Sequence, residues 1–258
     1  MQWSKKRCVV LDMDGTVYLG NIPIKPSVSF IQRHWNDLNF YFLTNNTSKS
    51  LNTYVTKLNG MGIPATKDIL ISPVLPLVNF LRLKQLNRIY LVGNRDFAKE
   101  LHTYMPELVE TEDQPLAIVL AYDTELTYAK LAKSALLLQD KNILFLATHP
   151  DLVCPSPEGP LPDVGSFLSL YYTATKRKPE YIFGKPDPLI LQPLLDRYDR
   201  EEMVMVGDRL STDKKLAENV GIDFALVLSG EAKVEDLAAE KIKPTVVLET
   251  LGAAEDSW

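Results

Sequence analysis

The sequence predicts an α/β fold built on a parallel, doubly wound sheet. Short apolar runs alternate with amphipathic stretches along all 258 residues. Several of these runs are continuously hydrophobic, as in strands that are covered on both faces. Because strands that alternate with helices pair in parallel, the alternation favours a doubly wound sheet. We expect strands at 7–11, 39–44, 89–92, 117–120, 143–147, 181–183, 203–206, 224–228 and 246–248.

Apolar residues at helical spacing mark helices between these strands. Each pattern follows a residue that can cap a helix: Ser48, Thr127 or Asp187. Asp187 is also followed by proline, which suits the first turn of a helix. We expect the corresponding helices near 51–58, 128–138 and 190–198.

Composition and charge exclude several classes of function. The formal net charge is −5 and no long basic run occurs, which argues against binding a nucleic-acid polymer. A small phosphorylated substrate needs only one or two cations. No segment reaches the length of a membrane span, so we expect no membrane partner. Cys8 and Cys154 form no paired motif, so we expect a cytoplasmic protein without a thiolate zinc site.

Two carboxylates end the first apolar run. Asp12 and Asp14 are followed at once by Gly15. Charges at the tip of a core strand are costly to desolvate unless they are paired, and a metal ion with a phosphoryl substrate would pair with them. An acidic turn is the alternative. A calcium loop would need glycine at its sixth position and glutamate at its twelfth, where Val17 and Pro23 stand.

A second polar segment follows the strand expected at 39–44. Thr44, Asn45 and Asn46 lie where that strand ends. The carboxyl ends of parallel strands open onto one edge of the sheet, where ligands bind. A hydroxyl and backbone N–H groups at a helix start suit phosphate oxygens. Taken alone, the segment is equally well a plain helix cap.

Two further segments complete the pattern. Lys185 stands between a glycine and a proline, which could hold it pointing inward as a counter-charge instead of in solvent. Asp208 follows the strand expected at 203–206 and would offer Mg²⁺ a hard oxygen ligand beside Asp12. Asp213 lies five residues later, where a helix dipole would also favour a carboxylate.

These four segments, in this order, resemble the motifs of haloacid dehalogenase superfamily phosphatases. The strings LDMDGTVYLGN and LTNNTS are similar to the NagD-like branch, which includes p-nitrophenyl phosphatases, phosphoglycolate and pyridoxal phosphatases, and nucleotidases. The resemblance implies a Rossmann-like core, formed by 1–86 and 180–258, interrupted by an inserted α/β cap domain at 87–179.

The resemblance also implies roles for individual residues. Asp12 would be the nucleophile that forms an aspartyl-phosphate, and Asp14 would protonate the leaving oxygen and then activate water. Lys185 would stabilise the developing charge. Asp12, Asp208 and the carbonyl oxygen of Asp14 would bind Mg²⁺, with Asp213 supporting the ion from nearby. The implied phosphate-binding residues are Thr44, Asn45 and Asn46.

The chain departs from the NagD-like pattern at two places in the expected cap. His149 replaces the asparagine of the common pattern Ala-Thr-Asn-x-Asp. Asp163 replaces the first glycine of the common pattern Pro-Gly-x-Gly. Together with Asp151, these residues are candidates for setting substrate choice. We interpret the basic run at 176–178 as a solvated loop.

The sequence thus predicts a Mg²⁺-dependent phosphatase for a small phosphomonoester, such as a sugar phosphate, a nucleotide or a related metabolite. A phosphotransferase or mutase on the same scaffold would pass the phosphoryl group to an alcohol instead of water. A non-catalytic protein that binds phosphorylated ligands is a further alternative. The sequence leaves a homodimer open.

Overall fold

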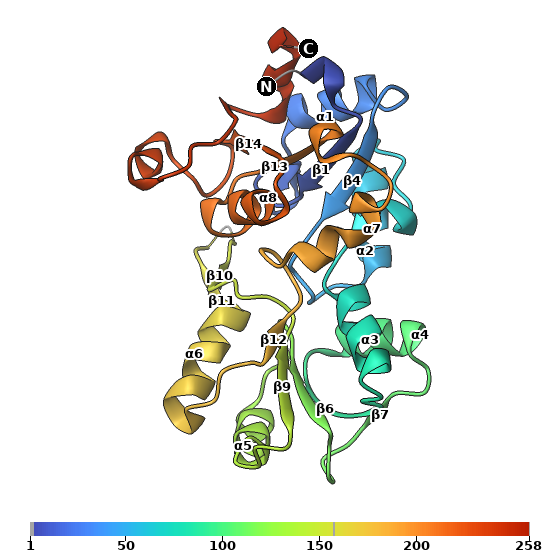
Figure 1. Cartoon of the computed structure of the whole chain (residues 1–258), viewed down its shortest axis with the longest axis vertical. Helices are drawn as coiled ribbons and strands as arrows, with labels where there is room; N and C mark the ends of the chain where they lie inside the picture. Colours follow the sequence, from blue (N-terminus) through green and yellow to red (C-terminus); the bar gives the residue numbers. More distant parts are fainter. Residues whose placement is uncertain (1–2, 157, 258) are drawn as a thin grey trace. The chain divides into compact units, whose positions relative to one another are not determined.

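The computed structural model describes residues 3–156 and 158–257. The chain divides into two compact units, each with its own parallel sheet (Figure 1). The first unit comprises Met1–Thr44, Tyr54–Ile71 and Lys185–Trp258, and the second comprises Asn45–Thr53 and Ser72–Gly184. The division of the chain into a core and a cap at 87 and 179 stays a prediction. By contacts, residues 72–86 belong to the second unit.

The first unit contains a six-stranded parallel sheet in the order β15-β14-β13-β1-β4-β5. The chain runs from β1 outward on one side and later returns to build the other side, so the direction of winding reverses at β1. This reversal is the point in an open α/β sheet where ligands bind. The strands are β1 (Cys8–Asp12), β4 (Asn39–Leu43), β5 (Leu70–Ile71), β13 (Met203–Gly207), β14 (Asp223–Val227) and β15 (Val246–Leu248).

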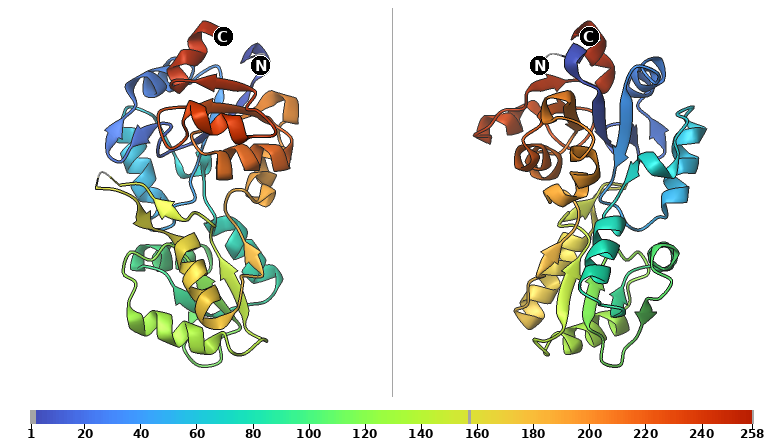
Figure 2. Two further views of the ribbon diagram at one scale, coloured as in Figure 1. Left: turned by 90° about the vertical axis from the view of Figure 1, so that its left-hand side faces the viewer. Right: turned by 45° about the vertical axis from the view of Figure 1, so that its right-hand side comes forward.

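Helices cover both faces of this sheet (Figure 2). Val10, Tyr41 and Met205 stand side by side on β1, β4 and β13, and they pack in one cluster with α7 (Gln192–Leu195) and α8 (Lys215–Val220). On the opposite face, Phe40 packs edge-on against Phe30 of α1 (Lys25–Arg33). All five residues of β1 are buried, which explains the apolar run that precedes Asp12.

The second unit contains a five-stranded parallel sheet in the order β12-β9-β8-β6-β7. Apolar clusters place α3 (Val74–Leu83) and α4 (Arg95–Tyr104) on one face and α5 (Tyr128–Leu137) and α6 (Val164–Thr175) on the other. An antiparallel pair, β10 (Val153–Cys154) and β11 (Leu161–Pro162), precedes α6. The sheet strands are β6 (Arg88–Val92), β7 (Val109–Glu110), β8 (Ala117–Leu120), β9 (Leu144–Ala147) and β12 (Tyr181–Ile182).

The structure confirms the predicted fold class and the predicted strands, whose ends shift by a residue or so. The helix expected at 190–198 is shorter than predicted. It consists of a 3₁₀ turn, Pro188–Leu191, and the four residues of α7. Pro193 lies inside that stretch and has no N–H to continue a helical hydrogen-bond ladder. The helix α2 (Leu51–Gly60) follows Ser48 and Ser50 as expected.

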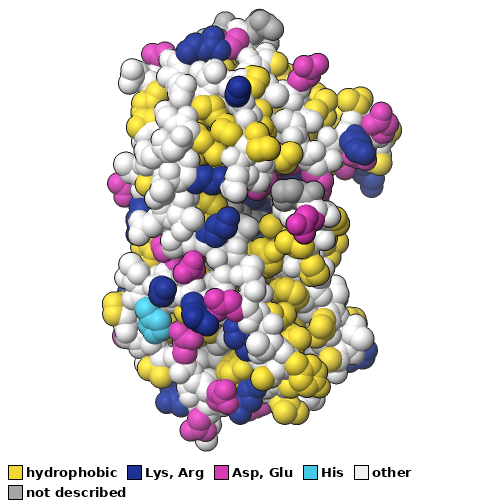
Figure 3. Space-filling view, turned by 180° about the vertical axis from the view of Figure 1, so that it is seen from behind, with side chains coloured by type: hydrophobic (Ala, Val, Ile, Leu, Met, Phe, Trp, Pro, Cys, Tyr) yellow, Lys and Arg dark blue, Asp and Glu magenta, His cyan; other side chains and the backbone are white. Residues whose placement is uncertain are grey.

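Charged side chains of both signs lie on the described surface. On the face drawn in Figure 3, Lys and Arg side chains alternate with Asp and Glu, and no broad basic field appears. Among the helices of residues 3–156 and 158–257, none is both long enough and apolar enough to cross a bilayer.

The core of the second unit offers a test of its packing. Phe145 of β9 is fully buried and packs edge-on against Tyr171 of α6, with ring centroids 5.5 Å apart. We expect Phe145→Ala to lower the free energy of unfolding by about 3–5 kcal/mol, because it removes a large buried side chain and leaves a cavity. Urea denaturation measures this change. Leu136→Ala, at a side chain that is 71% exposed, is the control and should stay within about 0.5 kcal/mol of the parent. An equal loss in both variants would contradict this packing.

Candidate active site

Three carboxylates meet at the carboxyl edge of the first sheet. Asp12 is the last residue of β1, and Asp208 directly follows β13, the strand that pairs with β1. Asp213 lies in the π-helical turn Leu210–Lys214, after Asp208. Each of the three offers an oxygen, and these oxygens all lie within 4.8 Å of one another. All three residues are buried.

Lys185 supplies the counter-charge within this group. Its side chain is buried, and its Nζ donates hydrogen bonds to Oδ1 of Asp12 and, at 2.6 Å, to Oδ1 of Asp213. The structure therefore places Lys185 inward, as the sequence allowed, and not in solvent. We name Asp12, Lys185, Asp208 and Asp213 the carboxylate cluster.

Backbone donors hold two of the carboxylates. The Arg209 N–H donates to Oδ2 of Asp213 at 3.1 Å, and the Glu231 N–H donates to Oδ2 of Asp208 at 2.7 Å. Oδ1 of Asp208 is buried and has no hydrogen-bond partner. A buried oxygen without a partner is energetically costly, and a bound cation would satisfy it. The donor set and this oxygen both fit a hard divalent cation.

Burial shifts the pKa values in the carboxylate cluster. Burial raises the pKa of Asp12 well above its usual range, opposed by Lys185 and reinforced by Asp213 and Asp208. Burial and the nearby Asp213 raise the pKa of Asp208 to about 7, although the Glu231 N–H bond opposes the rise. Burial alone would lower the pKa of Lys185, but Asp12 and Asp213 outweigh it and raise this pKa. Three carboxyl groups against one ammonium thus leave the site short of positive charge.

Two glycines make room for the carboxylates. Gly15 has φ of +89°, and a Cβ atom there would lie 2.3 Å from Oδ2 of Asp208. A Cβ atom at Gly207 would lie 2.3 Å from Oδ2 of Asp213. Any larger residue at either position would collide with the cluster, and at Gly15 it would also need a left-handed backbone conformation.

Asp14 and Thr44 lie nearby in the same unit, but Asp14 is not part of the carboxylate cluster. Asp14 is half-buried, and its Oδ1 accepts a 3.3 Å hydrogen bond from the Gly20 N–H. Gly20 sits at the turn between β2 (Tyr18–Leu19) and β3 (Ile22–Pro23), where its carbonyl accepts from Nζ of Lys57 at 2.5 Å. Thr44 is buried directly after β4.

Family comparisons identify the kind of protein that carries this site. A model of haloacid dehalogenase-like hydrolases matches residues 9–105, and a second model, of HAD-hydrolase-like proteins, matches residues 182–254. The chain belongs to the haloacid dehalogenase-like hydrolases. The first match contains Asp12, Asp14 and Thr44, and the second contains Lys185 and both remaining acids of the carboxylate cluster.

Named relatives of this hydrolase cover nearly the whole chain. A 4-nitrophenylphosphatase from Thermotoga maritima is 37% identical, with a TM-score of 0.92 over 99% of this chain and 98% of that one. An acid sugar phosphatase from Staphylococcus epidermidis is 30% identical over 95% of both chains. These findings confirm the resemblance inferred from the sequence, which includes p-nitrophenyl phosphatases.

A third relative has been solved with metal ions. A glycerol phosphate phosphatase from Mycobacterium tuberculosis, in complex with calcium, is 27% identical, with a TM-score of 0.86 over 97% of this chain and 75% of that one. The same protein in complex with magnesium gives a TM-score of 0.85 over 97% of this chain and 77% of that one.

Asn45 and Asn46 of this hydrolase belong to the second unit and bond within it. Nδ2 of Asn45 donates to Oδ1 of Asp151 at 3.0 Å. Oδ1 of Asn46 accepts from both the N–H and the hydroxyl of Ser48, and its Nδ2 contacts Sγ of Cys154 at 3.7 Å. Their approach to a substrate phosphate, expected from the sequence, stays a prediction.

Sequence reasoning missed the residues that follow β14. Ser229 donates from its hydroxyl to the Gly15 carbonyl at 2.6 Å, and Glu231 holds Asp208 through its N–H. A Cβ atom at Gly230 would lie 1.9 Å from Oδ2 of Asp208. The signal was available, because Ser229 and Gly230 directly follow the strand expected at 224–228.

The raised pKa of Asp208 predicts how stability depends on pH when no divalent cation is bound. Its pKa is about 7 in the folded protein against an ordinary value of 3.8, so the folded state holds the proton more tightly. Protonated Asp208 therefore stabilises the folded state at low pH, and this stabilisation is lost as the pH rises through about 7. The free energy of unfolding should fall between about pH 4.5 and about pH 7.

Urea denaturation of the chelator-treated protein at the two pH values measures this slope. Asp208→Asn removes the titrating group, so we expect a shallower fall in that variant than in the parent. Identical slopes in the two proteins would contradict the assigned direction.

Proposed function

We propose that the chain is a Mg²⁺-dependent phosphatase that hydrolyses a small phosphomonoester through an aspartyl-phosphate on Asp12. The observation that carries the proposal is the carboxylate cluster. It supports the proposal because a candidate nucleophile, a buried ammonium group and several carboxylate oxygens lie close together where the winding of the sheet reverses. A phosphoryl group needs these three components together.

Asp12, Asp208 and the carbonyl oxygen of Asp14 would hold the Mg²⁺, with Asp213 close by. Carboxylate and carbonyl oxygens suit this ion. Supporting observations are the unpartnered Oδ1 of Asp208 and the excess of carboxyl groups over ammonium groups. When bound, Mg²⁺ supplies positive charge next to the phosphoryl oxygens and draws the pKa values of the ligating carboxyls down.

The proposed reaction has two displacements at phosphorus. A carboxylate oxygen of Asp12 attacks the phosphorus atom, the bond to the ester oxygen breaks, and Asp14 gives its proton to the departing alcohol. Asp14, now a carboxylate, takes a proton from water, whose oxygen attacks the aspartyl-phosphate. The bond between phosphorus and Asp12 breaks, inorganic phosphate leaves, and both aspartates return to their starting protonation states.

The surroundings of the two aspartates support this division of labour. Asp12 accepts from Lys185, whose positive charge opposes the rise in the Asp12 pKa that burial causes, and bound Mg²⁺ would oppose it further, towards the ionised form required of a nucleophile. Asp14 is half-buried and lies outside the carboxylate cluster. The two carboxyl groups therefore meet different electrostatic environments, as an acid and a nucleophile acting side by side require.

The substrate class follows the relatives. Their names are acid sugar phosphatase, 4-nitrophenylphosphatase and glycerol phosphate phosphatase. Sugar phosphates, 4-nitrophenyl phosphate and glycerol phosphate are all small phosphomonoesters. We propose a small phosphorylated metabolite, such as a sugar phosphate, as the substrate of this chain. 4-Nitrophenyl phosphate is the probe used below.

Asp12→Asn tests the nucleophile. The amide keeps the shape of the side chain but does not attack phosphorus, so we expect hydrolysis of 4-nitrophenyl phosphate to fall by more than about a thousandfold. Circular dichroism checks that the fold is retained. Asp68→Asn, an exposed aspartate of the same unit, is the control and should keep full activity. Substantial phosphate release by folded Asp12→Asn would refute the assignment.

Asp208→Ala tests the metal site. We expect EDTA to abolish activity of the parent and Mg²⁺ to restore it. In Asp208→Ala the Mg²⁺ concentration for half-maximal activity should rise by at least about tenfold, because an oxygen ligand is lost. Asp68→Ala should titrate like the parent. An unchanged Mg²⁺ titration in Asp208→Ala would place the ion elsewhere.

A further inference from the structure

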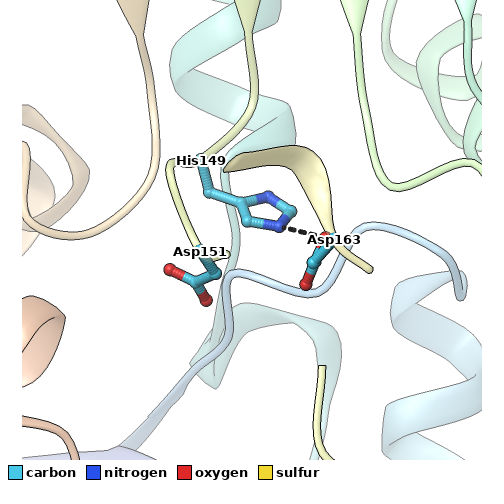
Figure 4. A group of neighbouring side chains, drawn as sticks. All are labelled: His149, Asp151 and Asp163. Carbon is cyan, nitrogen blue, oxygen red and sulfur yellow. Dashed lines mark hydrogen bonds and ion pairs between the residues drawn. The ribbon is translucent and has the colours of Figure 1, made fainter. Parts of the chain in front are cut away.

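We infer that His149 and Asp163 form a positioning pair that fixes the 148–152 loop of the second unit and, through Asp151, the side chain of Asn45. Figure 4 shows His149 pointing at Asp163, with Asp151 on the same loop as the histidine. Nε2 of His149 lies 2.9 Å from Oδ1 of Asp163, and the histidine is completely buried. The consequence for phosphate binding rests on the proposed function, whereas the pair itself does not.

Hydrogen bonds on both sides of the ring fix the proton on His149. A carboxylate only accepts, so Nε2 carries the hydrogen that is donated to Asp163. Nδ1 of a neutral ring then accepts, and the Thr148 hydroxyl donates to it at 2.9 Å. The Thr148 oxygen in turn lies 3.5 Å from the Thr47 hydroxyl, whose oxygen accepts from the Tyr122 N–H at 3.0 Å. The donors all run in one direction, from a backbone N–H to a carboxylate.

The start of α6 clamps the same loop. The Gly165 N–H donates to the Asp151 carbonyl at 2.8 Å, and the Asp163 N–H donates to the Leu152 carbonyl at 3.1 Å. A Cβ atom at Gly165 would lie 2.3 Å from the Pro150 carbonyl oxygen, so helix and loop are in close contact. Asp163 itself caps α6 by accepting from the Val164 N–H at 2.7 Å. The start of α6 thus binds the loop at three places: at His149 through its side chain, and at Asp151 and Leu152 through their carbonyls.

The fixed loop contacts residues next to two members of the proposed site. Asp151 accepts from Nδ2 of Asn45, which directly follows Thr44 in the chain. A Cβ atom at Gly184 would lie 2.5 Å from Oδ1 of Asn45 and 2.8 Å from Cβ of His149, and Gly184 directly precedes Lys185. The chain passes from one unit to the other at these two places. The pair thus fixes the loop that contacts Asn45 and Gly184, the second-unit residues at these two places.

A metal ion is the competing interpretation of this group. One atom each of His149, Asp151 and Asp163 lies within 4.8 Å of the other two. The hydrogen bonds already satisfy both ring nitrogens of His149, so the observations favour the positioning pair. Metal binding at His149 is an outcome of the experiment below.

Nitrogen NMR of the full-length Mg²⁺-loaded protein, labelled in histidine, tests the pair directly. The chain has three histidines, and the signals that vanish in His149→Asn belong to His149. We expect a neutral ring with its hydrogen on Nε2, unchanged when Zn²⁺ or Mn²⁺ is added. A hydrogen on Nδ1, a doubly protonated ring, or a shift caused by either metal would overturn the assignment. This readout does not depend on catalysis.

Kinetics test the positioning role. We expect His149→Asn to raise KM for 4-nitrophenyl phosphate and Ki for inorganic phosphate by about five- to tenfold, while kcat stays within about twofold. In an Asn45→Ala background the same substitution should have no further effect, because it acts through Asn45. Unchanged KM and Ki in His149→Asn, or additive effects in the double variant, would contradict the proposal.

Tyr171→Phe is the matched control. It removes a buried hydrogen bond of 2.5 Å between Tyr171 of α6 and Ser134, in the same unit. We expect it to lower the unfolding midpoint without changing KM, so that a loss of stability alone is told apart from a loss of positioning. If the parent enzyme showed no turnover, the proposed function would fail, while the NMR result would still decide the pair.

Discussion

The burial of three carboxyl groups against one ammonium at the edge of a parallel sheet is the constraint that organises this molecule. Lys185 bonds to Asp12 and Asp213, and Asp208 keeps one buried oxygen without a partner. Unpaired buried charge is costly, so without a cation burial raises the pKa values of Asp12 and Asp208 and favours their protonated forms. The divalent cation of the proposed function would supply the missing positive charge and would favour the ionised forms of these carboxyls.

The fold accommodates the buried carboxyl groups with glycines and backbone N–H groups, at positions where larger side chains would not fit. The sheet reverses its winding at β1, which brings the ends of β1 and β13 together. Gly15 and Gly207 then leave space for the carboxylates, while the N–H groups of Arg209 and Glu231 hold two of them in place. Rigid strands and backbone donors fix the acids more firmly than long side chains would, and preorganisation of this kind favours catalysis.

Much of this arrangement could be predicted from the sequence, because it depends on local patterns. Apolar runs predicted the strands, and the polar residues at their ends predicted that Asp12 and Asp208 would lie close together.

Other features depend on contacts between residues far apart in the chain. The residues around Lys185 left its direction open, since an isolated lysine is usually solvated, and the resemblance implied the inward position that the structure shows. The hydrogen bond between His149 and Asp163 joins residues 14 positions apart in the chain, and no periodic pattern in the sequence predicts it. The helix near Pro193 was predicted too long because apolar spacing outweighed the missing N–H.

Calorimetry of Mg²⁺ binding to the chelator-treated full-length protein, in two buffers with different ionisation enthalpies, tests the charge argument most directly. With the pKa of Asp208 raised to about 7, binding at about pH 6 must displace protons from the carboxylate cluster. The account predicts one saturable ion per chain with net proton release. Absence of saturable binding, or binding with no proton released, would contradict it.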